Sequence, residues 1–101
     1  MRAFVAVLTV ELHFPEAGSL KAKRRELAPV RTHLQNRLGA TVAEVAHQDQ
    51  WQRATLLAAL AGGSETRLHS VVDGLEYWLD ARFPHGARVE RRVVSLRDLD
   101  G

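Results

Sequence analysis

Apolar residues occupy every second position at the start of the chain. Between Phe4 and Phe14 all even positions are apolar, while the odd positions change from valine to polar residues along the segment. A period of two that includes β-branched residues predicts a β-strand with one face fully buried. Shorter apolar segments predict three more strands, at residues 41–47, 53–61 and 89–96.

Two other segments have the apolar spacing of an α-helix. The first begins after Ser19, a predicted N-cap, and ends before Gly39, which suits the left-handed position after a helix. Pro29 inside it predicts either a kink or a helix that restarts there. The second follows Ser64, another predicted N-cap, and ends at residues 84–86. The apolar stripes of the two helices are Leu20, Leu27, Val30, Leu34 and Leu38, and Leu68, Val71, Val72, Leu75 and Leu79.

The resulting order is β-α-β-β-α-β over a single domain of residues 1–101. This order is that of the ferredoxin-like fold, of the α+β class, in which four antiparallel strands form one sheet with both helices on one face. The strand directions then bring residues 19–25, 47–53 and 84–86 to one end of the domain. We expect Gly39 and the Gly62-Gly63 break at the opposite end.

The composition excludes several classes of site. The 101 residues contain no cysteine, which excludes disulfides, thiolate nucleophiles and cysteine-based zinc or iron–sulfur sites. No apolar stretch approaches the ~18–20 residues that a membrane-spanning helix needs, and no secretory signal pattern precedes the first strand. We therefore expect a cytoplasmic protein with no membrane partner.

Positive charge is concentrated on the first predicted helix. The formal net charge is only +2, but residues 21–37 hold six cations and one carboxylate, a local net charge of +5. A helix N-terminus carries about half a positive charge, so acids are favoured there and cations are not. Cations beside free N–H groups favour an anionic partner, although a solvated basic face is the alternative. Four of the cations lie in the first two turns: Lys21, Lys23, Arg24 and Arg25.

The predicted hairpin at residues 47–53 carries large polar side chains for a solvated turn. Trp51 can stack on a ring, Arg53 offers forked donors, and three glutamine amides can form hydrogen bonds. This set favours recognition of a partner. The alternative is structural, with Trp51 covering the end of the core and Asp49 capping the turn. The three glutamines are Gln48, Gln50 and Gln52.

Neither catalysis nor metal binding has a supporting motif. The patterns G-x-S-x-G, G-x-x-x-x-G-K-[ST] and G-x-G-x-x-G are absent, and no pair of carboxylates is placed for acid–base catalysis. His13, His47 and His85 fall near one end with Asp49, but without the short spacing of a metal motif. We expect no catalytic residue, no metal and no cofactor. The third strand also lacks aromatic residues, which disfavours RNA binding on the sheet face as in RNA-recognition domains.

Two motifs resemble the YlxP-like family, bacterial proteins of about this length catalogued as a domain of unknown function. One covers residues 11–15 and 19–25 and the other residues 43–54, while Pro29 and Gln50 depart from the family pattern. The resemblance implies a ferredoxin-like fold and no established activity. Members are often encoded among genes for transcription and translation factors, which implies an RNA or ribosome context. The predicted site residues that match the family pattern are Ser19, Lys21, Lys23, Arg24, Arg25, His47, Gln48, Asp49, Trp51, Gln52 and Arg53.

Our leading hypothesis is a small non-catalytic protein that binds structured RNA, ribosomal RNA in particular. Trp51 would stack on a base while Gln48 and Gln52 form hydrogen bonds. A protein–protein adaptor that docks on an acidic partner is the second hypothesis, and a small-ligand sensor or enzyme is the third. The cations predicted to contact phosphates are Lys21, Lys23, Arg24, Arg25 and Arg53.

The sheet face without helices is a second candidate surface. Val5 and Val7 lie on it, together with one of the two faces of the third strand. A partly apolar open sheet on a small protein predicts a homodimer. The two faces of the third strand are Ala54-Leu56-Ala58-Leu60 and Thr55-Leu57-Ala59.

Overall fold

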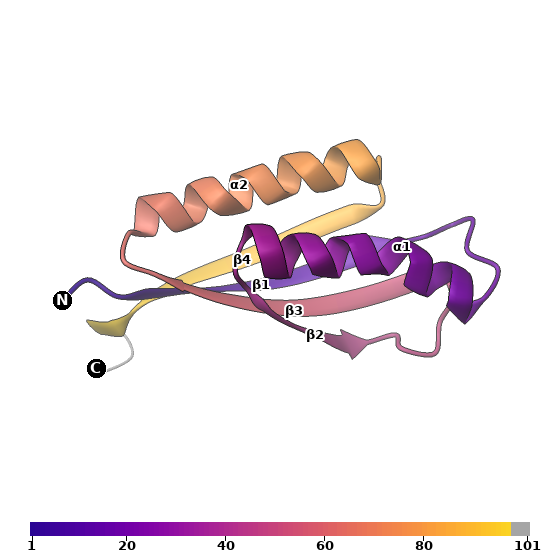
Figure 1. The fold of residues 1–101 in the computed structure, drawn as a ribbon, viewed down its shortest axis with the longest axis horizontal. Helices are drawn as coiled ribbons and strands as arrows, with labels where there is room; N and C mark the ends of the chain where they lie inside the picture. The colour runs from indigo at the N-terminus through magenta and orange to yellow at the C-terminus, as the bar shows by residue number, and fades with distance from the viewer. Residues whose placement is uncertain (98–101) are drawn as a thin grey trace.

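A four-stranded antiparallel sheet with two helices on one face forms the structure (Figure 1). The computed structural model describes residues 1–97; the tail predicted at residues 98–101 lies outside them. The order of the elements and the ferredoxin-like α+β fold are those predicted from the sequence. The elements are β1 (Phe4–His13), α1 (Leu20–Thr32), the π-helix η1 (His33–Arg37), β2 (Thr41–Ala46), β3 (Arg53–Gly62), α2 (Glu65–Arg82) and β4 (Ala87–Ser95).

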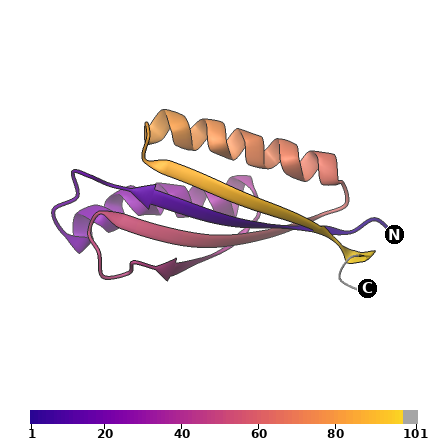
Figure 2. The same cartoon turned by 180° about the vertical axis from the view of Figure 1, so that it is seen from behind.

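The strands lie in the order β2-β3-β1-β4, so β1 and β3 are central. Leu8 of β1 is opposite Ala58 of β3 and opposite Arg91 of β4. Viewed from behind, the strands lie in front of α1, and no helix covers this face (Figure 2). The even positions of β1 from Ala6 to Leu12 are buried and face the helices, as the period of two predicts.

The core lies between the central strands and the two helices. The even positions of β1 and β3 are buried against apolar stripes of α1, η1 and α2. Thr55, Leu57 and Ala59 lie opposite Glu11, Thr9 and Val7 on the other face. This register decides between the two faces of β3 that the sequence left open. The core residues from the strands are Ala6, Leu8, Val10, Leu12, Ala54, Leu56, Ala58 and Leu60, and those from the helices are Leu27, Val30, Leu34, Leu68, Val72, Leu75 and Leu79.

The first helix passes through Pro29 without restarting. Helix α1 continues to Thr32, and the N–H of His33 donates to the carbonyls of Pro29 and Val30. The irregularity comes later, where the chain widens into the π-helix η1. Gly39 follows with a φ of 70°, and the N–H of Ala40 donates to the Leu34 carbonyl at 3.0 Å, which ends the helix.

The imidazole of His33 joins η1 to α2. It stacks on the ring of Trp78 with centroids 4.0 Å apart and planes 14° apart. The guanidinium of Arg82 lies 5.4 Å from the centroid of the Trp78 ring on the same helix. Burial lowers the pKa of His33, and the charge of Arg37 lowers it further. The neutral imidazole is therefore favoured in this contact between helices.

We predict that Gly39→Ala lowers the free energy of unfolding by about 1–2 kcal/mol, because a Cβ is disfavoured at a φ of 70°. Gly18→Ala is the matched control, because a Cβ at either position has no atom within 4 Å and only Gly39 has a left-handed φ. This control should change stability by less than about 0.5 kcal/mol. Urea denaturation of both variants checks the prediction, and equal losses would contradict it.

Candidate functional site

Three loops meet at the end of the domain where α1 begins. The His13 N–H donates to the Gly86 carbonyl at 2.8 Å, and the Phe14 N–H donates to the Gln52 carbonyl at 2.9 Å. Figure 1 shows the β1–α1, β2–β3 and α2–β4 connections at this same end, on the right. We call residues 13–25, 47–53 and 83–88 the basic end. The meeting of these three connections confirms the prediction made from strand direction, which placed residues 19–25, 47–53 and 84–86 at one end.

Ser19 caps α1 as predicted. Its backbone is extended, with a φ of −165°, and its Oγ accepts a hydrogen bond from the Ala22 N–H at 3.0 Å. The first turn of α1 contains no acidic residue. The partial positive charge of the helix N-terminus therefore has no carboxylate on α1 beside it and adds to the charge of the cations there.

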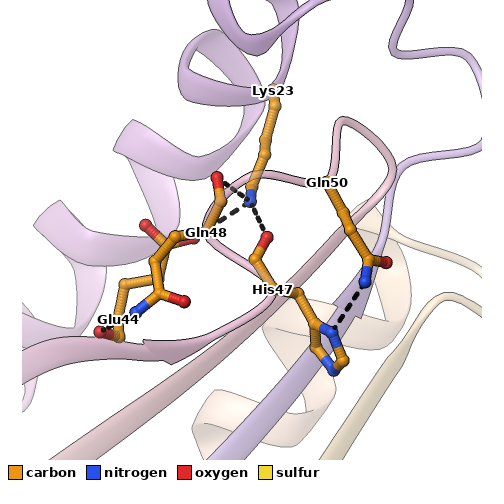
Figure 3. Close-up of polar contacts among 5 residues, drawn as sticks. All are labelled: Lys23, Glu44, His47, Gln48 and Gln50. Atoms are coloured by element: carbon orange, nitrogen blue, oxygen red, sulfur yellow. Dashed lines mark hydrogen bonds and ion pairs between the residues drawn. The ribbon is translucent and has the colours of Figure 1, made fainter.

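Lys23 lies inside the protein rather than on its surface. Only 2% of its side chain is exposed, and its Nζ donates to the carbonyl of His47 at 2.8 Å and to that of Gln48 at 3.4 Å (Figure 3). The Oε2 of Glu44 lies 3.0 Å from the same Nζ and forms an ion pair with it. This corrects the grouping of Lys23 with the surface cations, because three internal partners surround its ammonium. The physical reason is the helical period, since position 23 lies between Leu20 and Leu27 on the buried stripe of α1.

The turn whose carbonyls accept hydrogen bonds from Lys23 begins with a residue in the left-handed backbone conformation. His47 has a φ of 64°, which ends β2 one residue before the predicted limit. Its carbonyl accepts the Gln50 N–H at 3.0 Å as well as the Lys23 ammonium, and the Gln50 amide nitrogen contacts the His47 Nδ1 at 3.2 Å. A non-glycine residue in this region costs of order 1 kcal/mol, which these bonds offset. The amide nitrogen of Gln48 donates to the Glu44 carbonyl at 3.4 Å.

Gln52 holds the β1–α1 connection. Its amide nitrogen donates to the Pro15 carbonyl at 3.2 Å and to the Ala17 carbonyl at 3.4 Å. The nitrogen that the sequence assigned to RNA therefore has partners within the protein. Together with Lys23 and the His47 carbonyl, it fixes the hairpin against α1 and β1.

The remaining predicted residues are exposed. Trp51 is 51% exposed, so about half of its surface is covered by the protein and half is open to solvent. The turn closes through the backbone of His47 and Gln50, and within residues 1–97 no bond of the Asp49 side chain is found. Four cations of the site are exposed and form no ion pair with any other described residue: Lys21, Arg24, Arg25 and Arg53.

Two hollows adjoin at the basic end and share the walls formed by His13 and Arg53. The first has a volume of about 170 Å³ and is also lined by Glu11, His85 and Arg88. The second has a volume of about 450 Å³, is more open, and is also lined by Asp49, Gln50, Trp51 and Gln52. Sequence reasoning missed the roles of His13, His85 and Arg88 in these hollows, although strand direction placed the two histidines near this end.

The histidines do not assemble into a metal site. Among residues 1–97, no group of three or more His, Asp or Glu side chains is placed to hold a metal ion. His47 instead uses its Nδ1 toward Gln50, and His13 and His85 line a hollow that also contains two arginines.

Comparison with known proteins places the chain in a family. The model of the family described as "Protein of unknown function (DUF503)" matches residues 5–92. The chain belongs to this family. It is 31% identical to the uncharacterized protein YlxP of Bacillus subtilis (strain 168) over 79 residues, which are 78% of this chain and 82% of that protein. The resemblance found in the sequence is thus confirmed.

Solved structures support the fold alone. The designed protein Foldit4 matches with a TM-score of 0.57 and 8% identity over 92% of this chain and 97% of that one. A protein of Thermus thermophilus described as PII-like and signaling has a TM-score of 0.49 and 15% identity, over 95% and 92% of the two chains.

In the described part of the chain, none of the helices has the length and apolar character to cross a membrane.

We predict that Lys23→Met lowers the free energy of unfolding by about 2–4 kcal/mol. Removing one partner of a buried ion pair leaves the other charge without compensation, although Glu44 is 22% exposed and can regain some water. The matched control is Lys21→Met, an exposed position on the same turn, with a change of less than about 0.5 kcal/mol. Urea denaturation of both variants decides, and similar losses would show that Lys23 is not a structural residue.

Proposed function

We propose that this protein is a non-catalytic cytoplasmic protein that binds structured RNA, ribosomal RNA in particular, through the exposed side chains of the basic end. The observation that carries the proposal is that this end holds four exposed cations without an ion pair to any residue of 1–97, together with a half-exposed tryptophan. All of them belong to segments held in place by internal hydrogen bonds. Because the backbone of these segments is already ordered, binding a partner requires ordering of the side chains but not of the loops.

The cations suit phosphate groups. Lys21, Arg24 and Arg25 lie in the first turns of α1, where the helix dipole adds to their positive charge. Arg53 lies at the start of β3, on the hairpin that Lys23 ties to α1. Burial of Lys23 lowers the number of predicted phosphate contacts from five to four, and the proposal rests on the remaining four.

Trp51 suits an unpaired base. Structured RNA is recognised mainly at loops and bulges, where bases are free to stack on aromatic side chains. An indole that is 51% exposed on a fixed hairpin offers such a surface. On the sheet face without helices, the positions of β3 are Thr55, Leu57 and Ala59, none of which is aromatic.

An acidic protein would also satisfy the cations, although it gives no reason for an exposed indole beside them. Purification from a bacterial lysate with and without nuclease separates the two partners. Under the proposal, RNA co-purifies with the protein and is lost after ribonuclease treatment. An acidic protein that co-purifies after the same treatment would favour the adaptor.

We predict that Lys21→Ala combined with Arg24→Ala weakens binding to a stem–loop RNA and lowers the slope of log K against log salt by about 1.5, since each phosphate contact contributes about 0.7–0.9. The control is Arg2→Ala combined with Arg67→Ala, which removes two exposed arginines away from the basic end. Its net charge equals that of the Lys21→Ala, Arg24→Ala variant. This control should leave the slope nearly unchanged. Equal effects of the two double variants would mean that binding depends on overall charge and not on the basic end.

We also propose that the protein forms a homodimer through the open face of the sheet. Leu57 of β3 is 41% exposed on this face, and Val7 and Val5 of β1 lie farther along it, opposite Ala59 and Ala61. Val45 is 48% exposed on the neighbouring strand β2. The face is apolar toward Val5 and becomes polar toward Glu11 and the basic end. Apolar strand positions of this kind are commonly covered by a second copy.

We expect sedimentation velocity to give the mass of a dimer for the wild type at high micromolar concentration. Leu57→Lys places a charge at the centre of the face and should give a monomer. Tyr77→Lys is the matched control, because Tyr77 is 81% exposed on α2, away from the open face, and this variant should remain a dimer. A monomeric wild type would rule the homodimer out.

A further inference from the structure

The two adjoining hollows at the basic end differ in size and chemistry. The smaller one, of about 170 Å³, lies below the ~300–1,000 Å³ of typical small-molecule pockets and fits a compact group. The larger one, of about 450 Å³, falls within that range. His13 and Arg53, which are paired across β1 and β3, form the wall between them. A ligand with two unlike parts can therefore occupy both hollows at once.

The smaller hollow is suited to an anion. Arg53, Arg88, His13 and His85 line it, together with the carboxylate of Glu11. The guanidinium of Arg88 also pairs with Glu90 at 2.8 Å on the exposed surface, so a bound anion competes with Glu90 for Arg88. The position of His85 is fixed by the backbone, since its φ is 61° and the next residue, Gly86, accepts the His13 N–H at 2.8 Å. Forked guanidinium donors match the geometry of phosphate oxygens. A phosphate group is the compact anion that this set recognises best.

The larger hollow is suited to a base. The half-exposed indole of Trp51 offers a stacking surface. The amide nitrogens of Gln50 and Gln52 are already used toward the His47 ring and the Pro15 and Ala17 carbonyls. Within residues 1–97 the Asp49 carboxylate has no partner, so it is the charged acceptor of this hollow that remains for a ligand, beside the guanidinium of Arg53. A carboxylate only accepts hydrogen bonds.

We propose that the two hollows together bind one guanine nucleotide, with its phosphate between Arg53 and Arg88 and its base on Trp51. Among the four RNA bases, only guanine presents two adjacent N–H donors on its Watson–Crick edge, and these match the two oxygens of Asp49. The inference deepens the proposed function, because it makes an unpaired guanine the feature of the RNA that this end recognises. A free guanine nucleotide has the same chemistry, so the experiment tests both sources.

The experiment measures binding of GMP, AMP and guanosine, and of two stem–loop RNAs that differ only by one guanine or adenine in the loop. We expect GMP to bind at least about fivefold more tightly than AMP, and the guanine stem–loop more tightly than the adenine one by a similar factor. Asp49→Asn should remove this preference. Arg88→Ala should weaken binding of GMP and leave binding of guanosine unchanged, because only GMP has a phosphate. Arg92→Ala on the same strand is the matched control.

The outcomes separate the two proposals. Stem–loop binding that is insensitive to the loop base, to Asp49→Asn and to Arg88→Ala would overturn the nucleotide site and leave RNA binding intact. Binding of GMP with the expected preference, but of neither stem–loop, would support the nucleotide site with a free nucleotide as its ligand and would contradict the proposed function. Absence of binding to every probe by a folded protein, checked by its thermal melt, would overturn both.

Discussion

The geometry of the basic end depends on the buried ammonium of Lys23. Taking a lysine out of water costs several kcal/mol unless its hydrogens find acceptors, and here two carbonyls and a carboxylate lie within 3.4 Å of Nζ. The two carbonyls belong to the turn after β2, and Lys23 belongs to the first turn of α1. One side chain therefore fixes the hairpin relative to the helix N-terminus.

The predicted site residues fall into two groups, those that hold the basic end together and those that are exposed to solvent. Ser19, Lys23 and Gln52 build the end, through the helix cap, the ion pair and the bonds to the β1–α1 connection. Within residues 1–97, the side chains of the exposed cations and of Trp51 form no hydrogen bond or ion pair that builds this end. The left-handed backbone of His47 belongs with the first group, because it turns the carbonyl toward Lys23. The side chains that we propose bind RNA thus belong to segments that internal bonds hold in place, an arrangement that favours recognition.

The period-two and helical patterns predicted the order of the elements, and strand direction predicted which loops meet, because both follow from backbone geometry. Burial of Lys23 was missed because a run of four cations suggests a solvated face, whereas the helical period places position 23 toward the sheet. No residue in the segment predicted the π-helix at His33–Arg37. The upstream Pro29 predicted an irregular helix, but at a different position. The hollows depend on the register that pairs His13 with Arg53, which strand patterns alone do not fix.

Residue-resolved amide hydrogen exchange in Lys23→Met tests the central role of this lysine most directly. If Lys23 holds the turn, exchange of the Gln50 N–H, which donates to the His47 carbonyl, should accelerate by tenfold or more relative to the wild type. Amides of the central β1–β3 ladder, such as Leu8 opposite Ala58, should accelerate only as far as the global loss of stability requires. Equal acceleration in the turn and the ladder, or an unchanged turn, would contradict the account.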